Sequence, residues 1–337
     1  MNNIQSIPNF SRATGTRIDC IISEIMQIRK DWPVEPDISR NFIDWDHSAL
    51  TEIRTALVEA ARGSFSGEAG EKGLEDHLFR RLEWDRAQVI PWLYGAFRLA
   101  GARVLEIGCG WGSSTTALAE QGTRLTAIDV VEYQLKVVEI RNRAMGLTNV
   151  DLRAMNAADI GDNFEKESFD AVVLFACLEH MTVPERLKSL AGSWDLIPKG
   201  GHIVITDTPN RLWYFDDHTS FLPFWHWLPD EMASEYMQRF SPRKDLAASI
   251  GLATDRMISL HRTGRGASFH EIELAIAPVN QLQILAGKDE FLRGRHAAYM
   301  EYWTASDARA YSELMGRMYP GVPAPFFERS LEIIIRK

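Results

Sequence analysis

Three alternating glycines follow a short apolar run, and they constrain this chain more than any other feature. Residues 104–112 read Val-Leu-Glu-Ile-Gly-Cys-Gly-Trp-Gly. The aliphatic residues predict a buried parallel strand, and Gly108, Gly110 and Gly112 predict a turn into a helix that begins near Ser113. Glycine permits positive φ angles and lets a ligand approach the backbone without meeting a Cβ. The segment therefore predicts a strand, a ligand-binding turn and a helix.

A second strand, residues 124–129, ends in an acid about 20 positions after Gly108. Such an acid lies at the end of the next strand, where its carboxylate can accept hydrogen bonds from both hydroxyls of a ribose. A dinucleotide fingerprint would need glycine where this chain has Ser113. Glu106, within the strand, would also repel a pyrophosphate. The spacing Gly-x-Gly-x-Gly therefore disfavours a dinucleotide.

An acid followed by Gly-x-Gly-x-Gly resembles the first motif of the class I S-adenosylmethionine-dependent methyltransferases. The resemblance implies S-adenosylmethionine as cofactor, held by the glycine backbone at 108–112, with Asp129 on its ribose. The sulfonium and ammonium groups of that cofactor suit a nearby acid better than a pyrophosphate does. The residues that this interpretation assigns to the cofactor are Glu106, Gly108, Cys109, Gly110, Gly112, Asp129, Val130, Asn156, Ala157 and Phe175.

The resemblance extends over residues 99–210. In residues 149–160 the family places an acid for the adenine amino group. Asn156 fits that position better than Asp159 by its spacing from the strand, and an amide oxygen can accept the same hydrogen bond. Strands near 103, 125, 150, 171 and 202 predict a Rossmann-like, doubly wound, mostly parallel seven-stranded sheet. Ligands bind outside the carboxyl ends of such strands, so the chemistry is expected there.

Two regions lie outside this core. Residues 1–98 predict an N-terminal helical region on the substrate side, with a loop at 62–70 and a kink or division at Pro91. Residues 99–337 predict the methyltransferase domain, with insertions at about 209–245 and 262–325. Its later elements are expected to be a sixth strand at 253–260, a helix opened by the capping box Ser268–Glu271, helices broken near Gly287 and Gly294 within 282–318, and a last strand at 330–336.

The stretch 208–229 concentrates aromatic and polar side chains directly after the fifth strand. Aromatic residues with a few convergent polar groups are typical of a small-molecule pocket. The alternative is that they pack the insertion onto the sheet. The candidate acceptor-binding residues are Trp213, Tyr214, His226 and Glu179.

Methyl transfer from a sulfonium is limited mostly by positioning, and a hydroxyl acceptor also needs a base. Histidine has the most suitable unperturbed pKa. His218 is the first candidate, with Asp216 or Asp217 orienting its ring, and His180 is the second. Glu179-His180 resembles half of the Glu-x-x-Glu-His pattern of metal-assisted ubiquinone-type O-methyltransferases, but the first position is Ala176. We therefore expect no metal. The alternative is a divalent cation held by Glu179, His180 and an acid of the insertion.

Composition favours a small-molecule enzyme. The net charge of −9 argues against a nucleic-acid partner, which would require a basic face. The three cysteines show no metal-binding spacing, which favours a reduced, cytoplasmic setting, and no apolar run is long enough to predict a membrane span. The expected function is O-methylation of a small-molecule acceptor. C- or N-methylation and cofactor binding without methyl transfer are the alternatives, and the oligomeric state stays open.

Overall fold

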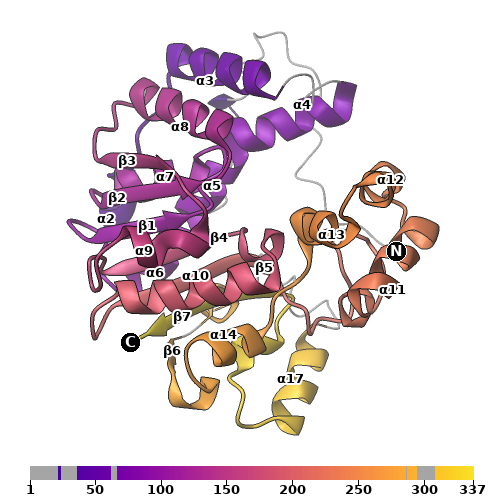
Figure 1. Ribbon diagram of the computed structural model, residues 1–337. Coiled ribbons are helices and arrows are strands. Elements are labelled where there is room, and N and C mark those ends of the chain that lie inside the picture. Colours follow the sequence, from indigo (N-terminus) through magenta and orange to yellow (C-terminus); the bar gives the residue numbers. More distant parts are fainter. Residues whose placement is uncertain (1–21, 24–35, 62–66, 286, 294–307) are drawn as a thin grey trace.

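The structure, a computed structural model, describes residues 22–23, 36–61, 67–285, 287–293 and 308–337 (Figure 1). Its centre is a seven-stranded sheet with the order β3-β2-β1-β4-β5-β7-β6. The strands are β1 Arg103–Ile107, β2 Arg124–Asp129, β3 Val150–Ala154, β4 Ala171–Phe175, β5 His202–Pro209, β6 Gln283–Leu285 and β7 Ser330–Arg336. Strands β1 to β5 are parallel, whereas β7 is antiparallel to both neighbours. The predicted doubly wound sheet is confirmed.

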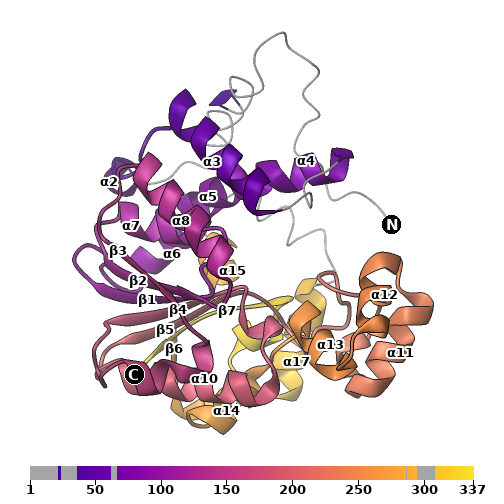
Figure 2. The same ribbon diagram turned by 45° about the horizontal axis from the view of Figure 1, so that its top comes forward.

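Helices cover both faces of the sheet (Figure 2). Helices α7 Ser113–Glu120 and α8 Glu132–Ala144 lie on one face with the N-terminal helices, and α10 Val183–Leu196 and α14 Phe269–Ala275 lie on the other. Successive residues of β4 enter opposite cores, Val173 on the first side and Val172 on the second. This burial on both faces explains why the strands read as nearly continuous aliphatic runs. The strand order reverses between β1 and β4, and the carboxyl ends of strands at such a switch point are the expected ligand site.

The N-terminal region is helical where it is described. It contains α2 Pro36–Ser39 and α3 His47–Ala60, which packs on α8. It then continues as α4 Gly67–Glu75, η1 Asp76–Arg80, α5 Arg81–Trp84, η2 Asp85–Val89 and α6 Ile90–Tyr94. Helix begins at Gly67, so the last four residues of the loop predicted at 62–70 are helical, and residues 62–66 lie outside the described residues.

Residues 67–94 form one helical run, so the chain is not divided at Pro91. The segment η2, which ends at Val89, two residues before Pro91, is π-helical. A π turn shifts the hydrogen-bonding register by one residue, and we attribute the tolerance of Pro91 to this wider turn.

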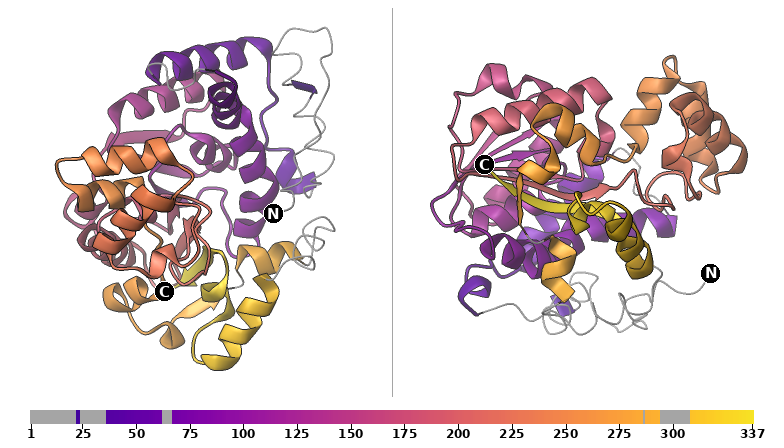
Figure 3. Two further views of the ribbon diagram at one scale, coloured as in Figure 1. Left: turned by 90° about the vertical axis from the view of Figure 1, so that its right-hand side faces the viewer. Right: turned by 90° about the horizontal axis from the view of Figure 1, so that it is seen from below.

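A long excursion separates β5 from β6. It comprises η5 Trp225–Trp227, α11 Asp230–Phe240, α12 Lys244–Leu252, α13 Arg256–Gly264, α14 and η6 Val279–Gln281. Helices α11 to α13 stand together beside the sheet (Figure 3), around a small core of their own that includes Trp225 and Met237. The capping box of Ser268 and Glu271 is present at the start of α14, as predicted.

The sixth strand predicted at 253–260 is wrong. Asp255 accepts hydrogen bonds from the backbone of Met257 and Ile258 and so caps helix α13 instead. Leu260 then contributes to the core of the excursion rather than to the sheet. The sixth strand is the three-residue β6. The predicted insertion at 209–245 and the first part of the one at 262–325 belong to one continuous excursion over residues 210–282, and the rest of the second lies between β6 and β7.

The end of the chain returns to the sheet. Helices α15 Lys288–Arg293 and α17 Ala308–Met318 and the turn η7 Ala324–Phe327 precede β7. The predicted last strand is therefore confirmed, but the helical prediction for 282–318 fails at β6, and Gly294 lies outside the described residues. Within the described ranges, no helix is both long and apolar enough to cross a membrane.

Candidate functional site

The glycine turn adopts the backbone that its sequence predicts. Gly108, Gly110 and Gly112 have φ angles of 77°, 50° and 86°. A Cβ on Gly108 would lie 2.5 Å from the Cβ of Cys177, whereas a Cβ on Gly110 would meet nothing within 4 Å. Gly108 is thus required for the contact between β1 and the segment after β4. Gly110 borders open space, as a backbone that receives a ligand must.

Asp129 ends β2 and faces this turn. Its Oδ2 accepts a 2.9 Å hydrogen bond from the backbone N–H of Gly110, and its Oδ1 accepts one of 2.9 Å from Val131. Two backbone donors therefore hold the carboxylate beside the turn. Each carboxylate oxygen can accept further hydrogen bonds, so the arrangement leaves room for ribose hydroxyls.

Glu106 lies beneath the turn and is fully buried. Its two carboxylate oxygens accept hydrogen bonds from the hydroxyls of Ser114 and Thr115, at the start of α7. Burial raises the pKa of Glu106 to about 7, against the lowering effect of these two hydrogen bonds. The acid therefore joins β1 to the first turn of α7.

The other residues assigned to the cofactor follow successive strands. Cys109 comes after β1, Val130 after β2, Ala157 after β3 and Phe175 ends β4. Val130 is exposed and the other three are buried. All four are thus at the carboxyl edge where a ligand of this sheet is expected.

Asn156 does not present a free amide oxygen. The oxygen accepts a 2.9 Å hydrogen bond from the backbone of Ala158, which caps the short helix η3 Ala157–Asp159. The amide nitrogen lies 3.3 Å from Glu185 Oε1. An adenine contact at Asn156 would have to share the oxygen with this cap.

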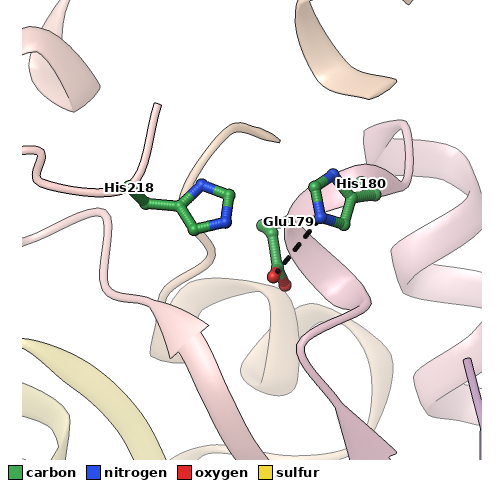
Figure 4. A group of neighbouring side chains, drawn as sticks. All are labelled: Glu179, His180 and His218. Atoms are coloured by element: carbon green, nitrogen blue, oxygen red, sulfur yellow. Dashed lines mark ion pairs between the residues drawn. The ribbon is translucent and has the colours of Figure 1, made fainter. Parts of the chain in front are cut away.

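Glu179, His180 and His218 form a cluster beyond the end of β4 (Figure 4). One ligand atom of each lies within 4.8 Å of the others. Glu179 and His180 belong to η4 Leu178–His180, directly after β4, and His218 belongs to the segment after β5. The tertiary fold thus brings the two candidate bases together, with their ring centroids 5.6 Å apart.

Hydrogen bonds assign the protons of both imidazoles. His180 Nδ1 lies 3.0 Å from the carbonyl oxygen of Arg262, so this nitrogen carries the proton. His218 Nδ1 lies 2.8 Å from Thr219 Oγ1, whose own proton is donated to the carbonyl of Gly264. His218 Nδ1 is therefore also the donor. His218 Nε2 is left with a free lone pair, whereas His180 Nε2 lies 3.7 Å from Glu179 Oε1, the pair marked by the dashed line in Figure 4.

Burial controls the charges in this cluster. Glu179 is fully buried, and neither carboxylate oxygen has a hydrogen-bond partner among the described residues. Burial raises its pKa to about 8. Burial also lowers the pKa of His218 to about 4, helped by His180, and lowers that of His180. Near neutral pH the cluster therefore holds two neutral imidazoles and a largely protonated carboxyl group.

Comparison with known proteins identifies the core. Residues 104–201 match the family described as "Methyltransferase domain". The ubiquinone biosynthesis O-methyltransferase of Xanthomonas axonopodis pv. citri (strain 306) is 34% identical over 131 residues, which make up 39% of this chain and 49% of that protein. The enzyme of the same name from Pseudomonas fluorescens (strain Pf0-1) is 31% identical over 122 residues, or 36% and 50%. Residues 104–201 form a class I methyltransferase domain.

The expected S-adenosylmethionine dependence and cofactor are confirmed for the methyltransferase domain. This chain spans about half the length of the curated relatives it matches. Among solved structures, a SAM-dependent methyltransferase from Methanosarcina mazei is 20% identical, covers 58% of this chain and 86% of its own, and has a TM-score of 0.39.

Neither aspartate of the insertion orients the ring of His218, contrary to the prediction. Asp216 is buried and accepts hydrogen bonds from the backbone N–H groups of residues 218, 219 and 220. Asp217 forms an ion pair with Arg329. The partner of the His218 ring is the hydroxyl of Thr219. A catalytic role for Asp217 would have to operate from within its ion pair.

His226 is also placed differently from the prediction. It is 2% exposed; its Nδ1 accepts a hydrogen bond from Gly266, and its Nε2 lies 3.3 Å from Asp216 Oδ1. Both nitrogens are engaged inside the excursion, so His226 supports the loop rather than presenting a free group to an acceptor.

The aromatic residues of the insertion divide into two groups. Trp213 is buried against Tyr214 and Tyr311, with ring centroids 4.7 and 5.0 Å away. Tyr311 donates to the carbonyl of Leu212. This group packs α17 onto the segment after β5. Its role is therefore packing, the alternative to acceptor binding that the sequence left open. The other group, including Phe224 and Trp227, is exposed on the excursion.

Sequence reasoning missed an ionic group at the end of β5. Asp207 lies near the carboxyl end of β5. Lys288 Nζ lies 3.1 Å from Asp207 Oδ1 and 2.9 Å from Glu332 Oε2. The position of Asp207 at a strand end was a signal in the sequence. No local pattern indicated that Lys288, 81 residues later, would be its partner.

Proposed function

We propose that this protein transfers a methyl group from S-adenosylmethionine to an oxygen atom of a small-molecule acceptor. The observation that carries the proposal is the cluster of Glu179, His180 and His218, which lies at the carboxyl edge shared with the glycine turn and offers the free Nε2 lone pair of His218. The relatives named above as O-methyltransferases support transfer to oxygen.

The proposed mechanism rests on positioning and on one proton transfer. When bound, S-adenosylmethionine supplies a methyl group that its sulfonium already activates, so the transfer is an in-line displacement. The glycine backbone and Asp129 hold the nucleoside end of the cofactor. His218 Nε2 accepts the proton that the acceptor hydroxyl loses as the new carbon–oxygen bond forms. His180 is the second candidate for this role.

The low basicity of His218 restricts the acceptor. A pKa lowered to about 4 keeps the ring neutral near pH 7 but makes it a weak base. Proton transfer is efficient only when the pKa values of donor and base are not too far apart. The proposal therefore favours a phenolic or enolic hydroxyl over an aliphatic one.

A second candidate role for the same cluster is to hold a divalent cation. The buried carboxyl group of Glu179 favours it, because no described residue gives it a hydrogen bond and its one ion pair, to His180 Nε2, is 3.7 Å long, and a buried polar group is costly unless it finds partners. Two imidazole nitrogens and one carboxylate are a known donor set for divalent metals. In this variant the metal would polarise the acceptor oxygen, and His218 would be a ligand instead of a base.

Product analysis tests the proposed function. The purified protein is incubated with methyl-labelled S-adenosylmethionine and bacterial metabolite extracts, and the products are analysed by mass spectrometry. We expect a product that is heavier by one methyl group, with the label on oxygen. Label on nitrogen or carbon would replace the O-methylation proposal, and cofactor binding without any labelled product would favour a binding protein.

Metal titration separates the two roles of the cluster. If His218 is the base, methylation survives exhaustive chelation. Loss of activity that magnesium or zinc restores would favour the metal. Calorimetric titration of zinc into Glu179→Gln and into His261→Ala provides the matched comparison, because His261 is also paired with an acid but lies outside the cluster.

A further inference from the structure

Asp207 occupies an unusual backbone conformation at the carboxyl end of β5. Its φ angle is 54°, a left-handed conformation that a non-glycine residue adopts only at a cost. Glu332 of β7 accepts the backbone N–H of Asp207 at 3.1 Å and the hydroxyl of Thr206 at 2.6 Å. These two bonds hold the backbone in place. The position of Asp207 is therefore determined by a neighbouring strand and not by its own preference.

The side chain of Asp207 is fixed separately. Lys288, at the start of α15 and only 4% exposed, places Nζ 3.1 Å from Asp207 Oδ1. Burial alone would raise the pKa of Asp207, but the charge and hydrogen bond of Lys288 outweigh it, so the pKa is lowered. The carboxylate is thus ionised near neutral pH. The Lys288 ammonium is buried, whereas the Asp207 side chain is 41% exposed. The carboxylate is therefore the accessible group of this ion pair.

Asp207 lies close to the cluster and to the N-terminal helices, because β5 contacts η4 and α15, which carries Lys288, contacts η2. Its charge contributes to the raised pKa values of Asp85 and Glu179, for both of which burial is the larger cause. Asp85 belongs to η2, and Glu106 beneath the glycine turn acts on it as well. The groups that share this end of the sheet are Asp85, Glu106, Asp129, Glu179 and Asp207. One of them, Glu179, is fully buried without a hydrogen-bond partner among the described residues.

We propose that Asp207 is a further ligand-contacting residue of the methyl-transfer site. It favours a positively charged or hydrogen-bond-donating group at the transfer centre, and Lys288 and Glu332 are its positioning residues. The inference rests on the proposed function, since it assumes that S-adenosylmethionine binds at these strand ends. It adds a specificity: the site prefers the cationic cofactor to its neutral product, and it rejects acceptors that carry an acidic group beside the methylated atom.

Binding of three nucleosides tests the inference without an acceptor. S-adenosylmethionine carries a sulfonium, sinefungin carries an amine in its place, and S-adenosylhomocysteine is neutral there. In isothermal titration at pH 7.5, we expect Asp207→Asn to weaken the binding of S-adenosylmethionine and of sinefungin about 5- to 30-fold. The binding of S-adenosylhomocysteine should weaken less than about twofold, because only the two cationic ligands lose their attraction to the Asp207 carboxylate. Asparagine tolerates the left-handed backbone and can still accept a hydrogen bond from Lys288.

Asp170→Asn is the matched control. Asp170 is also an ion-paired aspartate with 42% side-chain exposure, but it pairs with Arg103 at the opposite edge of the sheet. We expect it to leave all three affinities unchanged. Equal weakening of the three ligands by Asp207→Asn, or no weakening at all, would overturn the inference.

A measurement on the unaltered protein guards against a misfolded variant. Its acidic site should bind sinefungin at least about fivefold more tightly than S-adenosylhomocysteine. Equal affinities would contradict the inference without any substitution. If the unaltered protein bound none of the three nucleosides, the proposed function itself would fail, which distinguishes the two failures.

Discussion

The backbone N–H of Gly110 donates a 2.9 Å hydrogen bond to Oδ2 of Asp129. This bond joins the two features that the sequence singled out, the glycine turn after β1 and the acid that ends β2. It also means that the carboxylate is already oriented toward the turn before any ligand arrives. A preoriented group loses less conformational freedom on binding, so both residues should matter for cofactor affinity.

Asp129→Ala should weaken the binding of S-adenosylmethionine by roughly 10- to 150-fold, because a charged hydrogen bond typically contributes about 1.5–3 kcal/mol. Isothermal titration calorimetry measures the change. The affinity of Asp129→Asn should lie between those of the unaltered protein and of the alanine variant, because an amide keeps one acceptor oxygen. A loss below about threefold for the alanine variant would show that another residue binds the ribose.

Gly110→Ala should abolish cofactor binding, because the new methyl group would occupy space meant for the ligand and the residue would hold a left-handed backbone. Gly122→Ala separates these two causes. Gly122 has a φ of 72° and equally open surroundings, but it lies in the turn between α7 and β2, away from the site. Both variants should lose similar stability in thermal unfolding, and only Gly110→Ala should lose affinity. Intact cofactor binding by Gly110→Ala would contradict the assignment of the turn.

His218→Ala should lower turnover about 10²- to 10⁴-fold, the usual loss for a general base, and should leave cofactor affinity nearly unchanged. His226→Ala should leave turnover nearly unchanged and lower thermal stability, because Asp216 and the backbone of Gly266 lose their partner. Steady-state kinetics and thermal melts separate the two. Normal turnover in both His218→Ala and His180→Ala would mean that the acceptor needs no protein base, and carbon or amine methylation would then be favoured.

The contribution of Glu179 to stability should fall as the pH rises from about 5 to 8.5. Burial raises the pKa of Glu179 from 4.5 to about 8, so the folded state keeps a proton that the unfolded chain releases. The resulting advantage is complete below the unfolded pKa and is lost as the pH passes the folded value. Each such group contributes at most about 1.4 kcal/mol per pH unit.

Glu179→Gln should flatten this pH dependence of chemical unfolding. Glu185→Gln serves as the control, because a hydrogen bond to Arg262 is the first cause that lowers the pKa of Glu185, to about 2. That residue is ionised in both states throughout the range, so its variant should lower stability without altering the slope. An unchanged slope in Glu179→Gln would show that Glu179 is not protonated in the folded protein.

The parallel core could be predicted because its signals are local. Aliphatic strands, glycines at positive φ and the capping box of Ser268 and Glu271 depend on residues close together in the chain, and all of them appear in the structure. The strand predicted at 253–260 failed where two local signals competed. Asp255 supplied a helix cap, and burial of Leu260 in the separate core of the excursion made the helix the better solution.

The sequence by itself determined the pairing of the glycine turn with an acid, since the turn at 108–112 and Asp129 are joined by one strand-helix-strand unit. Only the tertiary structure decided which side chains meet beyond the ends of β4 and β5. His218 meets Glu179 and His180 there, and Lys288 meets Asp207 across 81 residues. These partners are brought together by the order of strands and by the long excursion. The identity of a hydrogen-bond partner, Thr219 instead of Asp216 for His218, depends on side-chain directions that no spacing encodes.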